Sequence, residues 1–229
     1  MSSSGASAPG TSSSSGAASS SSALPRIVAP SGLAVVPDGA LAEWDTATWT
    51  PLPAVAGAPQ PPVVDLSAYV AVQWNTDALC LAVMVTDDVH RNVESADSTY
   101  LWRGDSIQFA FDVDHDGDDA AYFTEDRELG CAVLSPDSQL RTYRWAPTPA
   151  GATGSGTCSV QNADNTWYYE VCYTAAELGQ PAFTAGTVFG FCAMVNDDDG
   201  AGRDQWLELT PGMGTGKQPS LFRALELAP

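Results

Sequence analysis

The stretch Ile107-Gln-Phe-Ala-Phe-Asp-Val113 alternates large apolar side chains with small or polar ones. Successive side chains of a β-strand point to opposite faces of a sheet, so this spacing predicts a strand with one apolar face. The run Leu79-Cys-Leu-Ala-Val-Met-Val85 follows the same rule, with apolar residues at every second position. Strands with one apolar face must bury it against another layer, which predicts a sheet packed on a sheet.

Similar short runs recur along the chain, separated by breaks rich in Asp, Asn, Gly and Pro. Only 174–178 is typical of a helical turn. Strands without intervening helices favour an all-β fold, an antiparallel β-sandwich of the jelly-roll kind. The expected strands are Ala68–Trp74, Leu79–Thr86, Ser106–Val113, Ala120–Thr124, Cys131–Leu134, Arg141–Trp145, Thr166–Tyr173, Thr187–Val195, Gln205–Leu209 and Leu221–Leu227.

The chain divides by composition into three parts. Residues 1–22 are almost wholly Ser, Gly and Ala, which predicts a flexible tether because nothing in them can be buried. Residues 23–37 form a proline-bearing lead-in, and residues 38–229 have the length of one sandwich domain. We expect the tether to connect this domain to a cell surface or to another module.

The formal net charge of −19 comes from 28 acidic against nine basic residues. Nucleic-acid binding depends on Lys and Arg, so this balance argues against nucleic acid and also against an anionic membrane surface. No apolar run approaches the roughly 20 residues that span a bilayer, so no transmembrane segment is expected. A neutral ligand such as a sugar, or bound cations, fits the charge better; a solvated acidic surface explains it as well.

An acidic loop follows the strand at its Asp112 end. Asp112, Asp114, Asp116 and Asp118 alternate around Gly117, and Ca²⁺ in proteins takes six to eight oxygen ligands from such loops. The twelfth position is Phe123 rather than the Glu of an EF-hand, so we predict a structural Ca²⁺ site at a strand end. The acidic run 197–200 is a weaker candidate for a second site.

Five cysteines occur without a CxxC pair, so a zinc site is not expected. Four of them could form two disulfides. Cys158 and Cys172 flank a turn-like stretch at 163–165 and are the first candidate pair, with buried free thiols as the alternative.

No basic and apolar leader follows Met1. The long tether is nevertheless typical of exported or lipid-anchored proteins. We therefore expect an extracellular or cell-surface protein whose export signal has been removed.

Five segments stand out in order: Asp38-Gly-Ala-Leu-Ala-Glu-Trp44, Trp74–Asp88, Leu101–Asp112, Trp167-Tyr-Tyr-Glu-Val171 and Phe189–Asp197 followed by Arg203 and Trp206. Taken together, they resemble the family 9 carbohydrate-binding modules of the cellulose- and xylan-binding type. The resemblance implies a β-sandwich, a structural Ca²⁺ and a sugar held between two tryptophans. The family usually has glutamate where this chain has Gln108, which keeps one acceptor and gains two donors.

The apolar face of a pyranose stacks on an aromatic ring while its hydroxyls bond polar groups. Trp102 is the candidate for one of the two tryptophans that hold the sugar; the alternative is that it closes the end of the sandwich. Trp206 is the candidate for the second tryptophan; the alternative is that it belongs to the core. Trp145 and Trp167 are alternatives. The polar candidates for the ligand are Gln108, Asp105, Arg103, Asn196 and Arg203, with Asp105 also suited to capping loop amides.

The chain contains two histidines, His90 and His115, and neither belongs to a HExxH motif. No Gly-x-Ser-x-Gly elbow occurs either, so we expect no enzyme but a non-catalytic carbohydrate-binding domain. One alternative is a structural or protein-interaction domain of the same fold without sugar affinity. A remote one is a haem-binding electron-transfer sandwich with Met84 and His90 as iron ligands.

Overall fold

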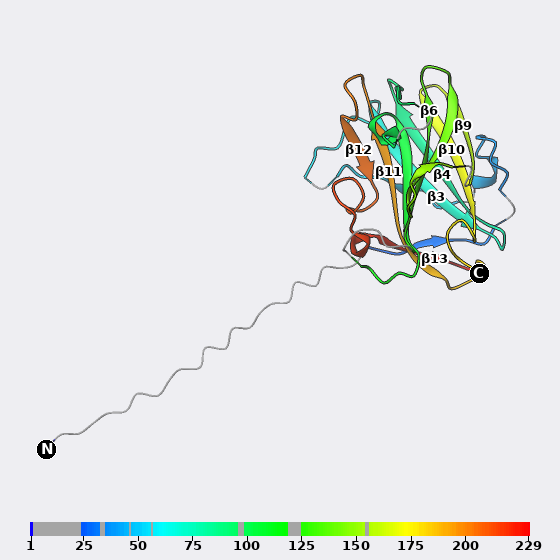
Figure 1. The fold of residues 1–229 in the computed structure, drawn as a ribbon, viewed down its shortest axis with the longest axis vertical. Coiled ribbons are helices and arrows are strands. Elements are labelled where there is room, and N and C mark those ends of the chain that lie inside the picture. Colours follow the sequence, from blue (N-terminus) through cyan, green and yellow to red (C-terminus); the bar gives the residue numbers. More distant parts are fainter. Residues whose placement is uncertain are drawn as a thin grey trace.

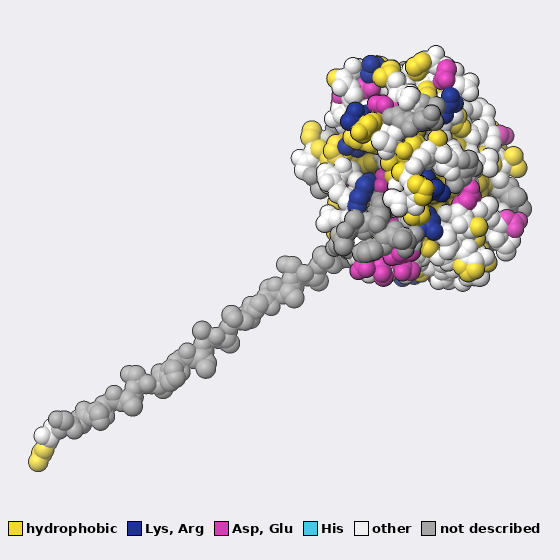
Figure 2. Space-filling view, viewed as in Figure 1, with side chains coloured by type: hydrophobic (Ala, Val, Ile, Leu, Met, Phe, Trp, Pro, Cys, Tyr) yellow, Lys and Arg dark blue, Asp and Glu magenta, His cyan; other side chains and the backbone are white. Residues whose placement is uncertain are grey.

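Two β-sheets pack face to face in the computed structural model, which confirms the predicted all-β sandwich (Figure 1). The structure describes residues 1, 24–32, 35–45, 47–55, 57–95, 99–118, 125–153 and 156–229. The tether predicted for residues 1–22, apart from Met1, and the strand predicted for Ala120–Thr124 lie outside the described residues. Figure 2 shows acidic side chains gathered at the lower edge of the domain.

The larger sheet has eight strands. Its pairs are antiparallel except β1 with β13, which is parallel and departs from the purely antiparallel sheet expected from the sequence. In spatial order the strands are β1 (Ile27–Ala29), β13 (Arg223–Leu227), β11 (Val188–Asp197), β5 (Ser106–Asp112), β6 (Arg127–Leu134), β7 (Gln139–Ala146) and β8 (Gly151–Ala152), with β12 (Gln205–Glu208) pairing β11.

The smaller sheet has five strands, all antiparallel. Its order is β2 (Thr50–Pro51), β3 (Leu66–Trp74), β4 (Ala78–Asp87), β10 (Thr166–Thr174) and β9 (Thr157–Ala163). The described residues also contain three short 3-10 helices: η1 (Ala42–Trp44), η2 (Leu101–Arg103) and η3 (Pro219–Leu221). Among the described residues, no helix has the length and apolar character needed to cross a membrane.

The core lies between the sheets and is rich in phenylalanine. Phe109 and Phe111 of β5 are fully buried beside Phe189 and Phe191 of β11. The rings of Phe111 and Phe191 lie 5.2 Å apart, centroid to centroid. The alternation read from the sequence therefore does face the core. The opposite face of β5 is buried too, and Gln108 on that face is only 3% exposed. Other residues therefore cover the outer face of the larger sheet at Gln108.

A buried carboxylate ties the start of the domain to β10. Glu170 is fully buried and accepts hydrogen bonds from the amides of Asp38 and Gly39 and, at 2.7 Å, from Nε1 of Trp44. Two of the segments that carry the family resemblance, far apart in sequence, thus meet in one hydrogen-bonded group. The glutamate is structural, because its acceptors are already used.

The predicted Cys158–Cys172 disulfide is wrong. In the β9–β10 hairpin Cys158 lies opposite Val171, so an offset of one residue turns the two cysteines to opposite faces. Cys172 instead lies directly across from Cys80 of β4, and these two form the disulfide. The thiol of Cys158 contacts that of Cys131 in the other sheet, with 2.7 Å between the Sγ atoms.

Candidate binding site

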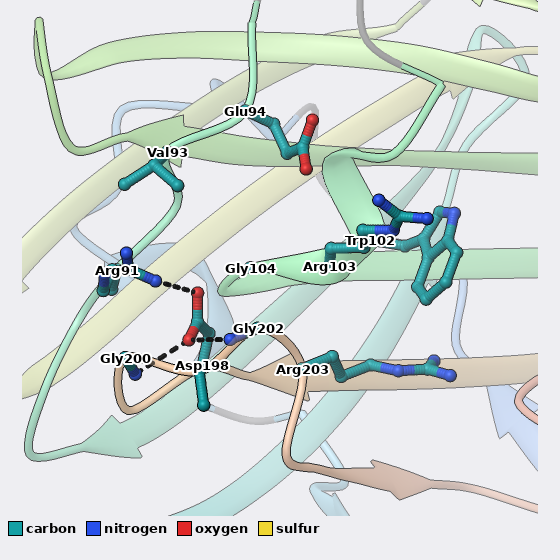
Figure 3. Close-up of a pocket in the computed structure, with 11 residues that line it drawn as sticks. Arg91, Val93, Glu94, Trp102, Arg103, Gly104, Asp198, Gly200, Gly202 and Arg203 are labelled. Atoms are coloured by element: carbon teal, nitrogen blue, oxygen red, sulfur yellow. Dashed lines mark hydrogen bonds and ion pairs between the residues drawn. The ribbon is translucent and has the colours of Figure 1, made fainter.

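Two adjoining hollows lie on the outside of the larger sheet, over β5 and the ends of β11 and β12. They have volumes of about 600 and 450 Å³ and share Trp102 and Arg203. Figure 3 shows the first, between η2 and the loop after β11. The first is lined by Arg91, Val93, Glu94, Trp102, Arg103, Gly104, Asp198 and Gly200–Arg203. The second is lined by Trp102, Gln108, Glu128, Trp145, Met194, Arg203 and Met213–Lys217.

Trp102 is held at the surface by the short turn η2. Leu101, the preceding residue, is buried and anchors this turn in the sheet. The fully buried side chain of Asn92 donates to the carbonyl of Leu101 at 2.9 Å and to that of Asp105 at 3.1 Å. Trp102 itself is half-buried, with the ring of Tyr100 edge-on to it at 6.3 Å. The indole therefore keeps an accessible surface on a fixed backbone.

Trp206 reaches the same site from β12, where it lies opposite Asn196 of β11. Its ring packs against the core and is half-buried. The guanidinium of Arg203 lies over both indoles, 4.7 Å from the centroid of Trp102 and 4.3 Å from that of Trp206. Arg203 thus connects the two predicted tryptophans, although of the two only Trp102 lines the hollows and Trp206 lies behind Arg203 at their edge.

Buried polar side chains form the floor of the second hollow. Gln108 donates from Nε2 to Oε1 of Glu128 at 2.8 Å and accepts from Nδ2 of Asn196 at 2.9 Å. Asn196 in turn accepts from Nη1 of Arg203 at 3.0 Å. Lys217 donates from Nζ to the same oxygen of Glu128 at 2.8 Å. The floor therefore orients Arg203 and holds one carboxylate beside Gln108.

Glu128 and Lys217 were missed by the sequence analysis. Glu128 and Gly130 share one face of β6, and Gly130 lies opposite Gln108 across the strand pair. The neighbouring strand thus places a carboxylate in hydrogen-bond contact with Gln108. The alternation within β6 was visible in the sequence, but the pairing register that brings it beside Gln108 was not.

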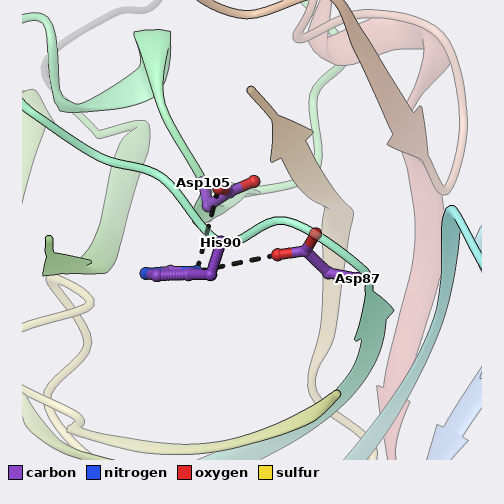
Figure 4. Close-up of side chains that lie close together, drawn as sticks. All are labelled: Asp87, His90 and Asp105. Carbon is purple, nitrogen blue, oxygen red and sulfur yellow. Dashed lines mark ion pairs between the residues drawn. The ribbon is translucent and has the colours of Figure 1, made fainter. Parts of the chain in front are cut away.

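Asp105 lies beneath the site and lines neither hollow. Its carboxyl group is buried and accepts from the backbone amides of Arg91 and Asp198, so it joins the two loops of the first hollow. Burial and the nearby Asp87 raise the pKa of Asp105 to about 9. Figure 4 shows Asp87 and Asp105 both directed toward Nδ1 of His90, which is 3.7 and 3.8 Å from their oxygens. We assign Asp105 a positioning role rather than contact with a ligand.

Asp105 makes folding stability depend on pH. Burial likewise raises the pKa of Asp197, to about 7. An unfolded aspartate titrates near pH 4, so between about pH 4 and 9 the folded chain holds protons that the unfolded chain has lost. The stabilisation that these two protonated carboxyl groups contribute is full below about pH 4. It declines as pH rises, and it is lost once pH has passed about 7 for Asp197 and about 9 for Asp105. In buffers with a chelator, we expect Tm to fall by about 5 °C between about pH 5 and 9, and an Asp105→Asn variant to lose the upper part of this dependence. A Tm that rises over this range would contradict the prediction.

The acidic run 197–200 has a divided role. Asp198 pairs with Nη1 of Arg91 at 2.8 Å, and its other oxygen accepts from the amides of Gly200 and Gly202, as Figure 3 shows. Asp198 thus shapes the loop. Asp197 and Asp199 come within 4.8 Å of Asp87, a group that could hold a cation.

The loop after β5 brings together three of the four predicted calcium ligands. Oxygen atoms of Asp112, Asp114 and Asp116 lie within 4.8 Å of one another. Oδ1 of Asp112 is buried and has no hydrogen-bond partner among the described residues, and burial raises the pKa of this carboxyl group. Asp118 is not in this group; its amide donates to Asp116 at 3.1 Å. The donors fit a hard cation, because they are carboxylates and one is left unsatisfied.

Comparison with known proteins identifies the family. Residues 38–228 match the family described as carbohydrate family 9 binding domain-like. No curated protein matches the chain. Two solved structures of a carbohydrate-binding module of family 9 from Caldicellulosiruptor kristjanssonii, one with cellotriose and one with glucose, match with TM-scores of 0.68 and 0.69. Each is 22% identical and covers 89% of this chain, and the alignments cover 94% and 95% of those chains. The chain belongs to the carbohydrate family 9 binding domain-like family.

Proposed function

We propose that the domain binds carbohydrate without catalysis, at the site around Trp102, Arg203 and Trp206. The observation that carries this proposal is the convergence of two indoles, from η2 and from β12, over a floor of buried polar groups. An aromatic face suits the apolar face of a sugar, and the surrounding donors and acceptors suit its hydroxyls. The fold shared with a module that binds cellotriose and glucose supports the same conclusion.

Arg203 has a defined part in this proposal. Its guanidinium lies where a sugar ring between the two indoles would stack, so a bound sugar displaces it toward the ring's edge. There its N–H groups can donate to hydroxyls. Trp145, which also lines the second hollow, extends the aromatic surface. The stacking face and the polar floor together orient the ring.

Affinity electrophoresis tests the proposal. The native chain is run in gels that contain soluble cellulose derivatives, xylans, mannans, pectins or β-glucans. We expect retardation on at least one, with no product released from it on prolonged incubation. Unchanged migration in every gel would favour the protein-interaction alternative, and released sugars would contradict the non-catalytic part.

We propose that the loop after β5 binds structural Ca²⁺ through Asp112, Asp114 and Asp116, with Asp118 beside them. The ion would neutralise close carboxylates and satisfy the buried oxygen of Asp112. A ligand that binds only the folded chain, at about 100 times its Kd, adds about 2.7 kcal/mol, so we expect Ca²⁺ to raise Tm over EDTA by about 5–10 °C. An Asp114→Asn/Asp116→Asn double variant should lose this difference. Equal Tm values for the native chain with Ca²⁺ and with EDTA would rule the site out.

We also propose an extracellular or cell-surface location. The Cys80–Cys172 disulfide supports it, because disulfides persist in oxidising compartments. Cell fractionation with a thiol-reactive mass tag tests this. A protein recovered in cytoplasm with both cysteines labelled would contradict it.

A further inference from the structure

We propose that the site prefers carbohydrate that carries a carboxylate, such as a uronic acid, over its neutral counterpart. This inference rests on the proposed function and specifies its ligand class. It departs from the neutral ligand that the overall charge of the chain favoured. The reason is the distribution of the basic residues over the surface.

Basic side chains are concentrated at the site. The whole chain has nine Lys and Arg residues against 28 Asp and Glu. Four of the nine line the two adjoining hollows: Arg91, Arg103, Arg203 and Lys217. Three acids line the same hollows, Glu94, Asp198 and Glu128, so cations outnumber acids there. The side chains that line the two hollows therefore carry more positive than negative charge, whereas the rest of the chain is strongly negative.

Two of these four cations have an acidic partner, and the other two have none among the described residues. Arg91 pairs with Asp198, and Lys217 with Glu128, so their charges are balanced within the domain. Arg103 is exposed, and its guanidinium lies 3.9 Å from the ring centroid of Tyr100 and 5.5 Å from that of Trp102. Among the described residues, it forms no ion pair.

Arg203 is likewise without an ion pair in the described part of the chain. Its hydrogen bond goes to the neutral amide oxygen of Asn196, and its flat faces contact indoles. Burial lowers the pKa of Arg203, and the negative charge of Glu208 acts in the opposite direction by raising it. The oxygens of Glu208 are engaged by the amides of Met213 and Gly214 and by Trp206. A ligand carboxylate would supply the missing counter-charge.

The geometry suits a sugar acid. A guanidinium at the edge of a stacked sugar keeps its N–H groups free to donate. Arg203, once displaced from the face of Trp102, and Arg103, which lies beside the same indole, both meet this condition. A pyranose stacked on this indole would project an equatorial carboxylate from its rim toward Arg103 or Arg203. Two acids line the first hollow, Glu94 and Asp198. Asp198 is paired with Arg91, and Figure 3 places Glu94 on the wall opposite Arg203.

Matched ligands test the inference. The probes are xylotriose bearing one glucuronic acid, the same compound with its carboxylate reduced to the alcohol, and unsubstituted xylotriose. By titration calorimetry at low salt, we expect the acid to bind about tenfold more tightly than its reduced form, and this ratio to shrink with added salt. An Arg103→Gln/Arg203→Gln variant should bind the two forms equally, while an Arg26→Gln control, whose cation pairs with Glu226 elsewhere, should keep the native ratio.

Each outcome decides something different. Equal binding of the acid and its reduced form by the native chain overturns the preference and leaves carbohydrate binding intact. Loss of both forms in the double variant, with its Tm unchanged, means that the arginines serve hydroxyls, and it overturns the assignment of a carboxylate contact to them. Binding of no probe, together with unchanged migration in every affinity gel, removes the proposed function itself.

Discussion

Replacing Trp102 by alanine is expected to lower affinity for any carbohydrate that the native domain binds by about 30-fold or more. Exposed aromatic residues at the centre of a binding site often contribute 2 kcal/mol or more, and this indole is shared by both hollows. The fold should survive, because Leu101 rather than Trp102 is the buried residue of η2. Titration calorimetry with the retarding glycan measures the change.

Trp49 offers a matched control. It is half-buried and packs at 6.4 Å from the ring of Trp44, away from both hollows. The Trp49→Ala substitution removes an indole of the same size but leaves the site unchanged. The affinity of this variant for the glycan should therefore equal that of the native chain. Trp102→Phe should keep part of the affinity. Native affinity in Trp102→Ala would place the sugar elsewhere.

Replacing Glu170 by leucine is expected to destabilise the fold by about 3–5 kcal/mol. The leucine would leave two backbone amides and the indole N–H of Trp44 without an acceptor in a buried environment. It would also loosen the first residues of the domain from β10. Urea unfolding followed by tryptophan fluorescence gives the free-energy difference.

Two further substitutions separate this effect from a general loss of charge. Glu170→Gln keeps one oxygen acceptor and should fall between the native chain and the leucine variant. Glu226→Gln removes a carboxylate from a partly exposed pair with Arg26 and should change the unfolding free energy by less than about 1 kcal/mol. Similar losses at positions 170 and 226 would show that the buried network is not the cause.

The sequence predicted the inner strands and missed the edges. Period-two runs such as 79–85 and 107–113 are long enough to carry a signal, and they became β4 and β5. The strands β1, β2 and β8 have only two or three residues and show no periodicity. β9 was missed because its side chains are half-buried or exposed and its polarity does not alternate clearly.

The sequence predicted which residues belong to the site more readily than it predicted which of them contact one another. Trp102, Gln108, Asn196, Arg203 and Trp206 do come together, as the order of motifs suggested. Strand register lies outside what a single sequence reveals, and it decides which residues meet across a pair. For that reason the neighbour of Gln108 on β6 was missed, and a one-residue offset made the hairpin cysteine pairing wrong.

The parallel pairing of β1 with β13 has an architectural consequence. It places residues 27–29 of the lead-in beside the last strand of the chain, and Figure 1 shows this pair and the C-terminus at the lower end of the sandwich. The loops of η2 and of residues 198–204 lie at the other end of that view. A protein joined before residue 24 or after residue 229 would therefore attach at the end of the sandwich that lies away from these two loops.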